Sequence, residues 1–199
     1  MRDVSERVRK KMRERNKEAR GVLYLVACAA LPSQKIQDVV MLAKQAGWDV
    51  CVIATPKAAA NFLDSALLEQ ITGYPVRSEY KRPGEPDVLP RADALIVAPA
   101  TFNTINKWAL GITDTLALGL LCEYTGLRKP ILAVPCLLPT DLGMHPAFKK
   151  SVTLLREYGV SVLYEPEKYP PTNKVPGAVI LEMLHTITEP YLGEDARTV

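Results

Sequence analysis

Residues 94–116 read ALIVAPATFNTINKWALGITDTL, an apolar run that passes through a short turn into a helical pattern. The run 94–97 is typical of a buried parallel strand. The turn after it, 99–104, supplies a proline, two threonine hydroxyls and an amide side chain. A turn of this kind leaves unpaired backbone N–H groups at the helix N-terminus, close to the side-chain hydroxyls. The stretch therefore predicts a site for an anion or a cofactor at the end of a strand.

On both sides of this stretch, strand and helix patterns alternate along the chain. The other expected strands are 22–28, 49–54, 130–134 and 161–163, and the expected helices are 32–45, a helix from 57, 65–72, 116–126, 146–158 and 177–187. Such repeated strand–helix units with short links are typical of a doubly wound parallel sheet. We expect a Rossmann-like, flavodoxin-like α/β fold with three α/β/α layers and ligand sites at the carboxyl ends of the strands.

The chain is expected to form one domain, 21–190, between a basic N-terminal helix, 1–20, and a C-terminal tail, 191–199. Residues 1–20 carry nine Lys or Arg against four acidic residues, without Gly or Pro. Such a helix can pack on the domain or on a neighbouring subunit, can be partly disordered, or can bind nucleic acid or an anionic surface, of which packing is the favoured interpretation. Two proline-rich loops, 74–90 and 164–176, interrupt the alternation.

Composition narrows the classes of protein to consider. With 199 residues, 48% hydrophobic and 24% charged, the chain matches a globular protein of one domain. It has no apolar run of about 18 residues and no signal-peptide pattern, so we expect a cytoplasmic protein that does not enter a membrane. Its four cysteines lack Cys-x-x-Cys spacing and are expected to be buried free thiols; with only two histidines, no metal site is expected.

The turn after the strand at 94–97 also resembles a family signature. Pro99–Thr104 and the segment from Lys107 to Leu116 are similar to the Pro-Ala-Ser-Ala-Asn-Thr motif and its Lys-x-Ala-x-Gly-Ile-x-Asp-x-Leu continuation in the homo-oligomeric flavin-containing cysteine decarboxylases. That family includes phosphopantothenoylcysteine decarboxylase and the lantibiotic peptidyl-cysteine decarboxylases. The resemblance implies an FMN cofactor and an assembly, a trimer or dodecamer, with the flavin at subunit contacts.

The resemblance also implies which residues contact FMN. They lie in three strand-end turns and are Ala29, Ser33, Thr55, Lys57, Pro99, Ala100, Thr101, Phe102 and Asn103. The first turn lacks the glycine common in the family, so the phosphate contact is expected to fall to Ser33 and to the helix amides. From the residues alone, Ser33 can equally be a helix cap and Thr55 a turn residue.

The chain departs from the family pattern at two places that concern catalysis. Where the family has a histidine before the signature strand, this chain has Glu85, which can act as a base or simply be a solvated loop residue. The family's Pro-x-Met-Asn-x-x-Met-Trp motif recognises the substrate carboxylate, and its asparagine is replaced here by Leu138. His145 follows in the same loop and is either a site residue or a helix-start residue. Asn103, His145 and Glu85 are the candidate catalytic residues.

These observations favour FMN-dependent oxidative decarboxylation of the C-terminal cysteine of a peptide to an enethiol, as in peptide natural-product maturation. The alternative is a non-catalytic flavoprotein that binds FMN and regulates a partner. Phosphopantothenoylcysteine decarboxylation is less favoured because no cysteine follows Cys136, and flavin prenyltransfer is less favoured because the first turn departs from the Gly-Ser pattern.

Overall fold

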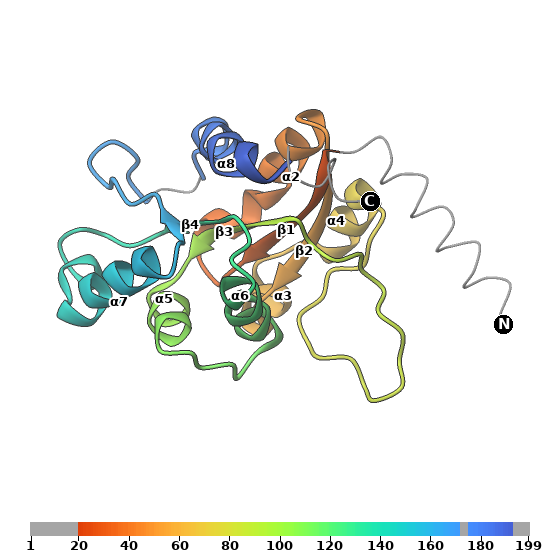
Figure 1. The fold of residues 1–199 in the computed structure, drawn as a ribbon, viewed down its shortest axis with the longest axis horizontal. Coiled ribbons are helices and arrows are strands. Elements are labelled where there is room, and N and C mark those ends of the chain that lie inside the picture. The colour runs from red at the N-terminus through yellow and green to blue at the C-terminus, as the bar shows by residue number, and fades with distance from the viewer. Residues whose placement is uncertain (1–19, 172–174, 193–199) are drawn as a thin grey trace, which may run out of the picture.

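A computed structural model describes residues 20–171 and 175–192. Five strands form one parallel sheet in the order β2-β1-β3-β4-β5 (Figure 1). They are β1 (Gly21–Ala27), β2 (Trp48–Ala54), β3 (Ala94–Ala100), β4 (Ile131–Pro135) and β5 (Ser161–Val162). This order is that of a flavodoxin-like doubly wound sheet, which confirms the expected fold class.

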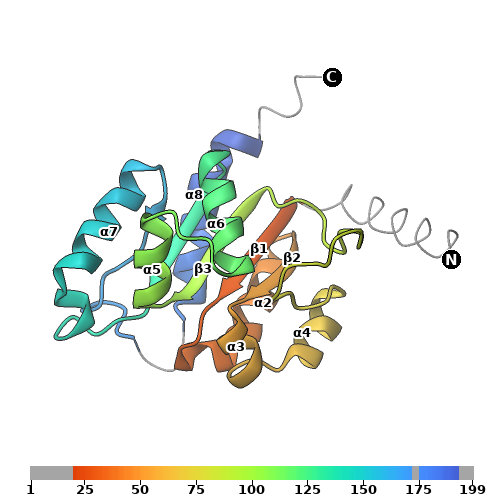
Figure 2. The ribbon, with the colours of Figure 1, turned by 90° about the horizontal axis from the view of Figure 1, so that it is seen from below.

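Helices cover both faces of the sheet. One layer holds α2 (Ile36–Gln45), α4 (Ser65–Thr72) and α8 (Gly177–Leu192), and the other holds α5 (Phe102–Ala109), α6 (Leu116–Gly126) and α7 (Pro146–Glu157) (Figures 1 and 2). Successive side chains of β1 point to opposite faces, so Leu23 packs in the first layer and Tyr24 in the second. Because both faces are covered, β1 to β3 are apolar along most of their length.

The element boundaries differ from the expected ones at two helices. The helix expected from residue 32 begins with a 3-10 turn, η1 (Leu31–Lys35), before α2. The last helix was expected to end at 187, whereas α8 continues through Pro190 to Leu192. A proline in the final turn removes only one backbone hydrogen bond, so the helix does not have to end before it.

The loop 74–93 follows α4, passes beside the carboxyl end of β2 and leads to the start of β3. Arg77 pairs with Ile53 of β2, and the Tyr80 hydroxyl donates to the Thr115 carbonyl oxygen at 3.2 Å. Figure 1 shows this loop on the opposite side of the molecule from α7. The basic helix expected at 1–20 and most of the tail expected at 191–199 lie outside the described residues. No helix within 20–171 or 175–192 is both long and apolar enough to cross a bilayer.

Candidate functional site

The carboxyl ends of four neighbouring strands meet at one edge of the sheet. Backbone hydrogen bonds connect them: Thr55 N–H donates to Ala27 O at 3.0 Å, Cys28 N–H to Pro99 O at 3.3 Å, and Cys136 N–H to Ala100 O at 2.9 Å. The connections run in opposite directions from β1 and β3, so a crevice is expected between their ends. This edge is where doubly wound folds bind their ligands.

The turn between β3 and α5 presents hydrogen-bonding groups beside that crevice. The Thr101 hydroxyl caps α5 by accepting from Thr104 N–H at 3.5 Å, and the two threonine hydroxyls lie 3.0 Å apart. Phe102 and Asn103 occupy the first turn of the helix, where backbone N–H groups have no intrahelical acceptor. The Asn103 side chain is exposed and makes no hydrogen bond within the described part of the chain. This turn therefore offers donors and one amide side chain to a ligand.

Cys28, at the end of β1, connects this turn to the neighbouring strand. The Thr104 hydroxyl donates to Cys28 Sγ at 3.3 Å, and the thiol is fully buried. Burial raises the pKa of the Cys28 thiol, and the hydrogen bond from Thr104 opposes that rise only in part. The thiol therefore stays protonated and positions the α5 turn rather than acting as a nucleophile.

The first predicted turn is arranged differently from expectation. The Ser33 hydroxyl donates to Cys28 O at 2.5 Å and is 1% exposed, so its hydrogen is used within its own turn. Ala29, in the same turn, is partly exposed at the end of β1.

In the second turn, the Thr55 hydroxyl caps α3 (Pro56–Asn61) by accepting from Ala58 N–H at 3.4 Å. Lys57 beside it is exposed, and its ammonium group makes no ion pair within the described residues. In the third turn, Pro99 and Ala100 are buried in β3, where they contribute backbone rather than side chains to the edge.

The loop after β4 brings a predicted catalytic residue to the α5 turn. His145 caps α7, its Nδ1 accepting from Ala147 N–H at 3.1 Å. Its ring packs edge-to-face against Phe102, with centroids 5.4 Å apart and an interplanar angle of 82°. Leu138, at the position of the family's asparagine, is 52% exposed. Two predicted site residues far apart in sequence, Phe102 and His145, thus lie in contact.

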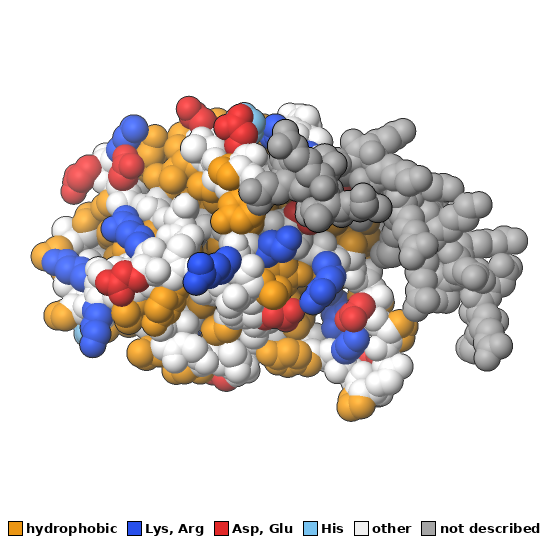
Figure 3. Space-filling model, viewed as in Figure 1, with side chains coloured by type: hydrophobic (Ala, Val, Ile, Leu, Met, Phe, Trp, Pro, Cys, Tyr) orange, Lys and Arg blue, Asp and Glu red, His pale blue; other side chains and the backbone are white. Residues whose placement is uncertain are grey.

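Within one chain, Glu85 does not lie near Phe102 and His145. It lies in the loop 74–93, where its Oε2 accepts from Arg82 N–H at 2.9 Å in a local turn. That loop and α7 lie on opposite sides of the molecule (Figure 1). On the face shown in Figure 3, basic and acidic side chains are interspersed. Across the described ranges, no three His, Cys, Asp or Glu side chains group closely enough to hold a metal ion.

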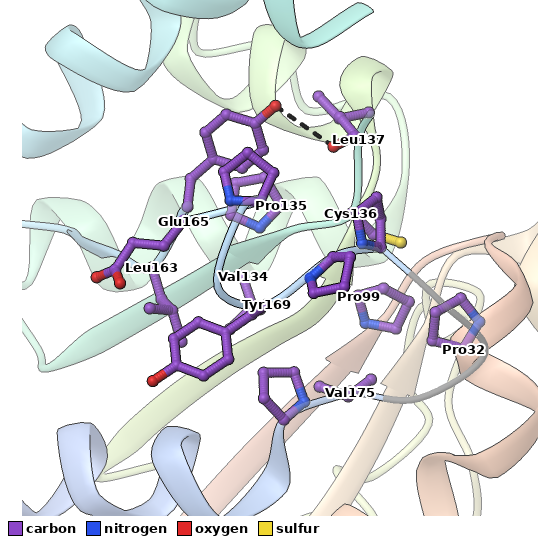
Figure 4. Close-up of a pocket in the computed structure, with 15 residues that line it drawn as sticks. Pro32, Pro99, Val134, Pro135, Cys136, Leu137, Leu163, Glu165, Tyr169 and Val175 are labelled. Carbon is purple, nitrogen blue, oxygen red and sulfur yellow. Dashed lines mark hydrogen bonds between the residues drawn. The ribbon is translucent and has the colours of Figure 1, made fainter. Parts of the chain in front are cut away.

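An apolar cavity adjoins the site at the ends of β4 and β5, and sequence reasoning did not identify it (Figure 4). Prolines from the strand ends and from the loop 164–176 line it, together with Cys136, Tyr164 and Tyr169. The Tyr164 hydroxyl donates to Leu137 O at 3.3 Å, and burial raises the pKa of the Cys136 thiol. With about 30 Å³ of space it holds about one water molecule, so it is too small for a flavin ring. The dense prolines of 164–176 were its only sequence signal.

The model of a family described as Flavoprotein matches residues 10–182. The coenzyme A biosynthesis bifunctional protein CoaBC of Bacillus subtilis is 30% identical over 155 residues, which cover 75% of this chain and 35% of that protein. The phosphopantothenoylcysteine decarboxylase of Mus musculus is 31% identical over 148 residues, 70% of this chain and 68% of that protein.

A cysteine/cysteine sulfinic acid decarboxylase from an unknown prokaryote is 38% identical, but over 72 residues that cover 36% of this chain and 19% of that protein. The chain thus spans about a third or less of the length of this decarboxylase and of CoaBC.

Solved structures share the fold. The FMN-dependent cysteine decarboxylase SpaF aligns with a TM-score of 0.69 at 20% identity, covering 83% of this chain and 96% of that one. The peptidyl-cysteine decarboxylase EpiD aligns with a TM-score of 0.64 at 24% identity, and the alignment covers 82% of this chain and 97% of that one.

Proposed function

Because this chain belongs to the Flavoprotein family, we propose that it binds FMN and catalyses the oxidative decarboxylation of a C-terminal cysteine in a peptide to an enethiol. The resemblance to decarboxylases supports the reaction class, since CoaBC, the mouse decarboxylase and SpaF all align with this chain. The observation that carries the proposal is the α5 turn, in which Thr101, Thr104 and Cys28 hold unpaired helix N–H groups at the crevice between β1 and β3.

The residues at this edge fit FMN in chemistry. A phosphate dianion is matched by helix N–H donors and by the Lys57 ammonium group beside Thr55. The Phe102 ring, partly exposed beside the α5 N-terminus, offers an apolar surface to a flavin ring. Ser33 is the predicted contact that fits least, because its hydroxyl donates to Cys28 O. Ala29, Pro99, Ala100, Thr101 and Asn103 remain proposed FMN contacts.

In the proposed reaction, FMN bound at this edge would supply the acceptor for a hydride equivalent. The substrate thiol loses its proton and its β-carbon loses the hydride, which leaves a thioaldehyde. The bond from the α-carbon to the carboxylate then breaks, CO₂ leaves, and the electron pair moves onto sulfur as an enethiolate that takes up a proton. Asn103 is proposed to orient the thiol and His145 to contact the peptide terminus. Glu85 remains a candidate, but no step is assigned to it because it lies apart from both.

The first test is the absorbance spectrum of the purified protein, with identification of the released pigment by mass spectrometry. Flavin bands and a pigment of the mass of FMN are expected. Peptides ending in cysteine are then expected to lose CO₂ and two hydrogen atoms. A colourless protein that takes up no added FMN contradicts the proposal, and bound FMN without turnover of any such peptide supports the non-catalytic alternative.

A second candidate is phosphopantothenoylcysteine decarboxylation, because the mouse enzyme aligns over 68% of its length. Incubation with phosphopantothenoylcysteine separates the two. Release of CO₂ from this compound, but not from peptides, favours the second candidate. The absence of any cysteine after Cys136 favours the first.

We also propose that the chain assembles as a homo-oligomer, a trimer or dodecamer, and acts in the cytoplasm as one flavoprotein domain, 21–190. Leu110 and Ile112 follow α5 and are 69% and 40% exposed, an apolar surface that a neighbouring copy can cover. Light scattering coupled to size exclusion tests the assembly, and a monomer in the presence of FMN contradicts it.

A further inference from the structure

We propose that His145 recognises the terminal carboxylate of the substrate by donating a hydrogen bond from Nε2. This role rests on the proposed decarboxylase function. In the family motif an asparagine recognises the substrate carboxylate, and Leu138 stands at its position in this chain. The proposal assigns that recognition to His145 instead. His145 is thus a specificity-determining residue and not a general base.

The helix cap decides which nitrogen of His145 carries the proton. Nδ1 accepts from Ala147 N–H at 3.1 Å, so Nδ1 holds no hydrogen. In a neutral imidazole, the hydrogen must then be on Nε2, on the opposite edge of the ring. In this tautomer Nε2 can donate but cannot accept, which suits an anion and excludes proton abstraction by that nitrogen.

Two contacts hold the ring beside the α5 turn. The first is the edge-to-face contact with Phe102. The second is a hydrogen-bond chain between the helices: Asn106 Nδ2 donates to Phe102 O at 2.9 Å, and the Ser151 hydroxyl of α7 donates to Asn106 Oδ1 at 2.7 Å. Because these bonds join the first turn of α5 to α7, the capping histidine cannot shift far from the turn that holds Asn103.

The other nitrogen of His145 is available to a ligand. The residue is exposed, and within 20–171 and 175–192 its Nε2 makes no hydrogen bond. The anions expected at this edge are the flavin phosphate and the substrate carboxylate. We assign the phosphate to the turn of Thr55 and Lys57 after β2, an edge strand separated from β4 by β1 and β3. The carboxylate is therefore the anion that His145 meets.

Two substitutions of His145 distinguish its role as the cap of α7, through Nδ1, from its role as a hydrogen-bond donor, through Nε2. His145→Asn keeps an oxygen acceptor near the position of Nδ1 and removes the distal donor. His145→Gln places an amide N–H₂ near the position of Nε2 and removes the cap. His185→Asn, at the other histidine, which is exposed on α8, is the matched control.

The experiment measures binding of two peptides to each FMN-loaded variant by calorimetry. Both end in serine in place of cysteine, so neither reacts, and one carries a free carboxylate while the other carries an amide. Wild type and His185→Asn are expected to bind the acid about tenfold more tightly than the amide, as a hydrogen bond to a charged group requires. His145→Asn is expected to bind both equally, and His145→Gln to keep most of the preference.

A second readout does not depend on substrate. In protein labelled with ¹⁵N at histidine, the His145 resonances are expected to show the Nε2–H tautomer, with His185→Asn supplying the assignment. An Nδ1–H tautomer overturns the inference, and so does an acid preference that survives in His145→Asn. Wild type that binds FMN and both peptides equally also overturns it, while leaving the cofactor proposal intact. Failure of wild type to bind FMN overturns the proposed function as well.

Discussion

The turns after β3 and β4 are neighbours at one edge of the sheet, but they are held in place differently. The turn after β3 depends on buried groups: Thr104 is 5% exposed and donates to the fully buried Cys28 thiol. The loop after β4 is anchored at its start, where Cys136 N–H donates to Ala100 O and the Tyr164 hydroxyl to Leu137 O, but further along it exposes Leu138 and His145. One turn is part of the core, and the other lies on its surface.

This difference separates two functions at one site. A turn whose threonine hydroxyls are hydrogen-bonded to one another and to a buried thiol keeps its free N–H donors in one geometry, which a rigid cofactor requires. An exposed loop can change its residues at little cost in stability, which suits recognition of different substrates. The chain follows this division, since it keeps the signature after β3 and departs from the family motif after β4.

The largest expected effect comes from the core side of the α5 turn. Ile105→Ala removes a fully buried side chain and is expected to lower the free energy of unfolding by about 2–5 kcal/mol. Leu138→Ala, the matched change in the exposed loop, is expected to alter it by less than about 0.5 kcal/mol. Urea denaturation followed by circular dichroism measures both. Equal losses in the two variants contradict the distinction between the turns.

The next effect concerns the cap of α5. Thr101→Ala removes the acceptor of Thr104 N–H and is expected to cost about 1 kcal/mol of unfolding free energy. FMN affinity, measured by quenching of flavin fluorescence, is expected to fall with it because the helix N–H groups lose their fixed position. Thr101→Ser keeps the hydroxyl and serves as the control. Unchanged stability and affinity in Thr101→Ala argue against the cap.

A smaller effect is expected in the pH dependence of stability. Because burial raises the pKa of the Cys28 thiol, the folded state keeps its proton where the unfolded chain, with a thiol pKa of about 8.5, loses it. Stability is therefore expected to fall as pH rises above about 8.5. In Cys28→Ala the fall between pH 7 and pH 9.5 is expected to be smaller by about 1 kcal/mol.

The control for this measurement is Cys136→Ala in the loop after β4. Burial also raises the pKa of the Cys136 thiol, but this side chain is only partly buried, so a smaller change in the pH dependence is expected. Denaturation at a series of pH values gives the slope of the unfolding free energy against pH for each variant. If Cys28→Ala leaves this slope unchanged, burial does not raise the pKa of the Cys28 thiol as stated.

The smallest effect on folding is expected at Asn103. Its side chain is exposed and makes no hydrogen bond within the described residues, so Asn103→Ala is expected to change the free energy of unfolding by less than about 0.5 kcal/mol. FMN binding or turnover is expected to fall nonetheless. If Asn103→Ala lowers the stability but keeps both FMN binding and turnover, Asn103 has a structural role instead.

Most of the fold was accessible from local patterns. The strands β1, β2 and β4 and the helices α4 and α6 lie within one residue of expectation, because continuous apolar runs and capping residues mark them, whereas β3 begins as expected and continues three residues past 97. The limits of η1 and α8 could not be predicted in this way. Pro32 and Pro190 restrict the backbone near a helix end, but they do not decide at which residue the helix begins or ends. The apolar cavity was missed for a related reason, since its lining comes from strand ends and from a loop without regular spacing.

The sequence by itself determined the alternation of strands and helices and the capped turn at Thr101, because these depend on residues a few positions apart. Only the tertiary structure decided which distant residues meet. It placed His145 against Phe102, used the Ser33 hydroxyl within its own turn, and left the loop 74–93, which contains Glu85, on the opposite side of the molecule from α7 (Figure 1). The physical reason is that strand order and helix packing set these distances, and both arise from burial over the whole sheet rather than from any local pattern.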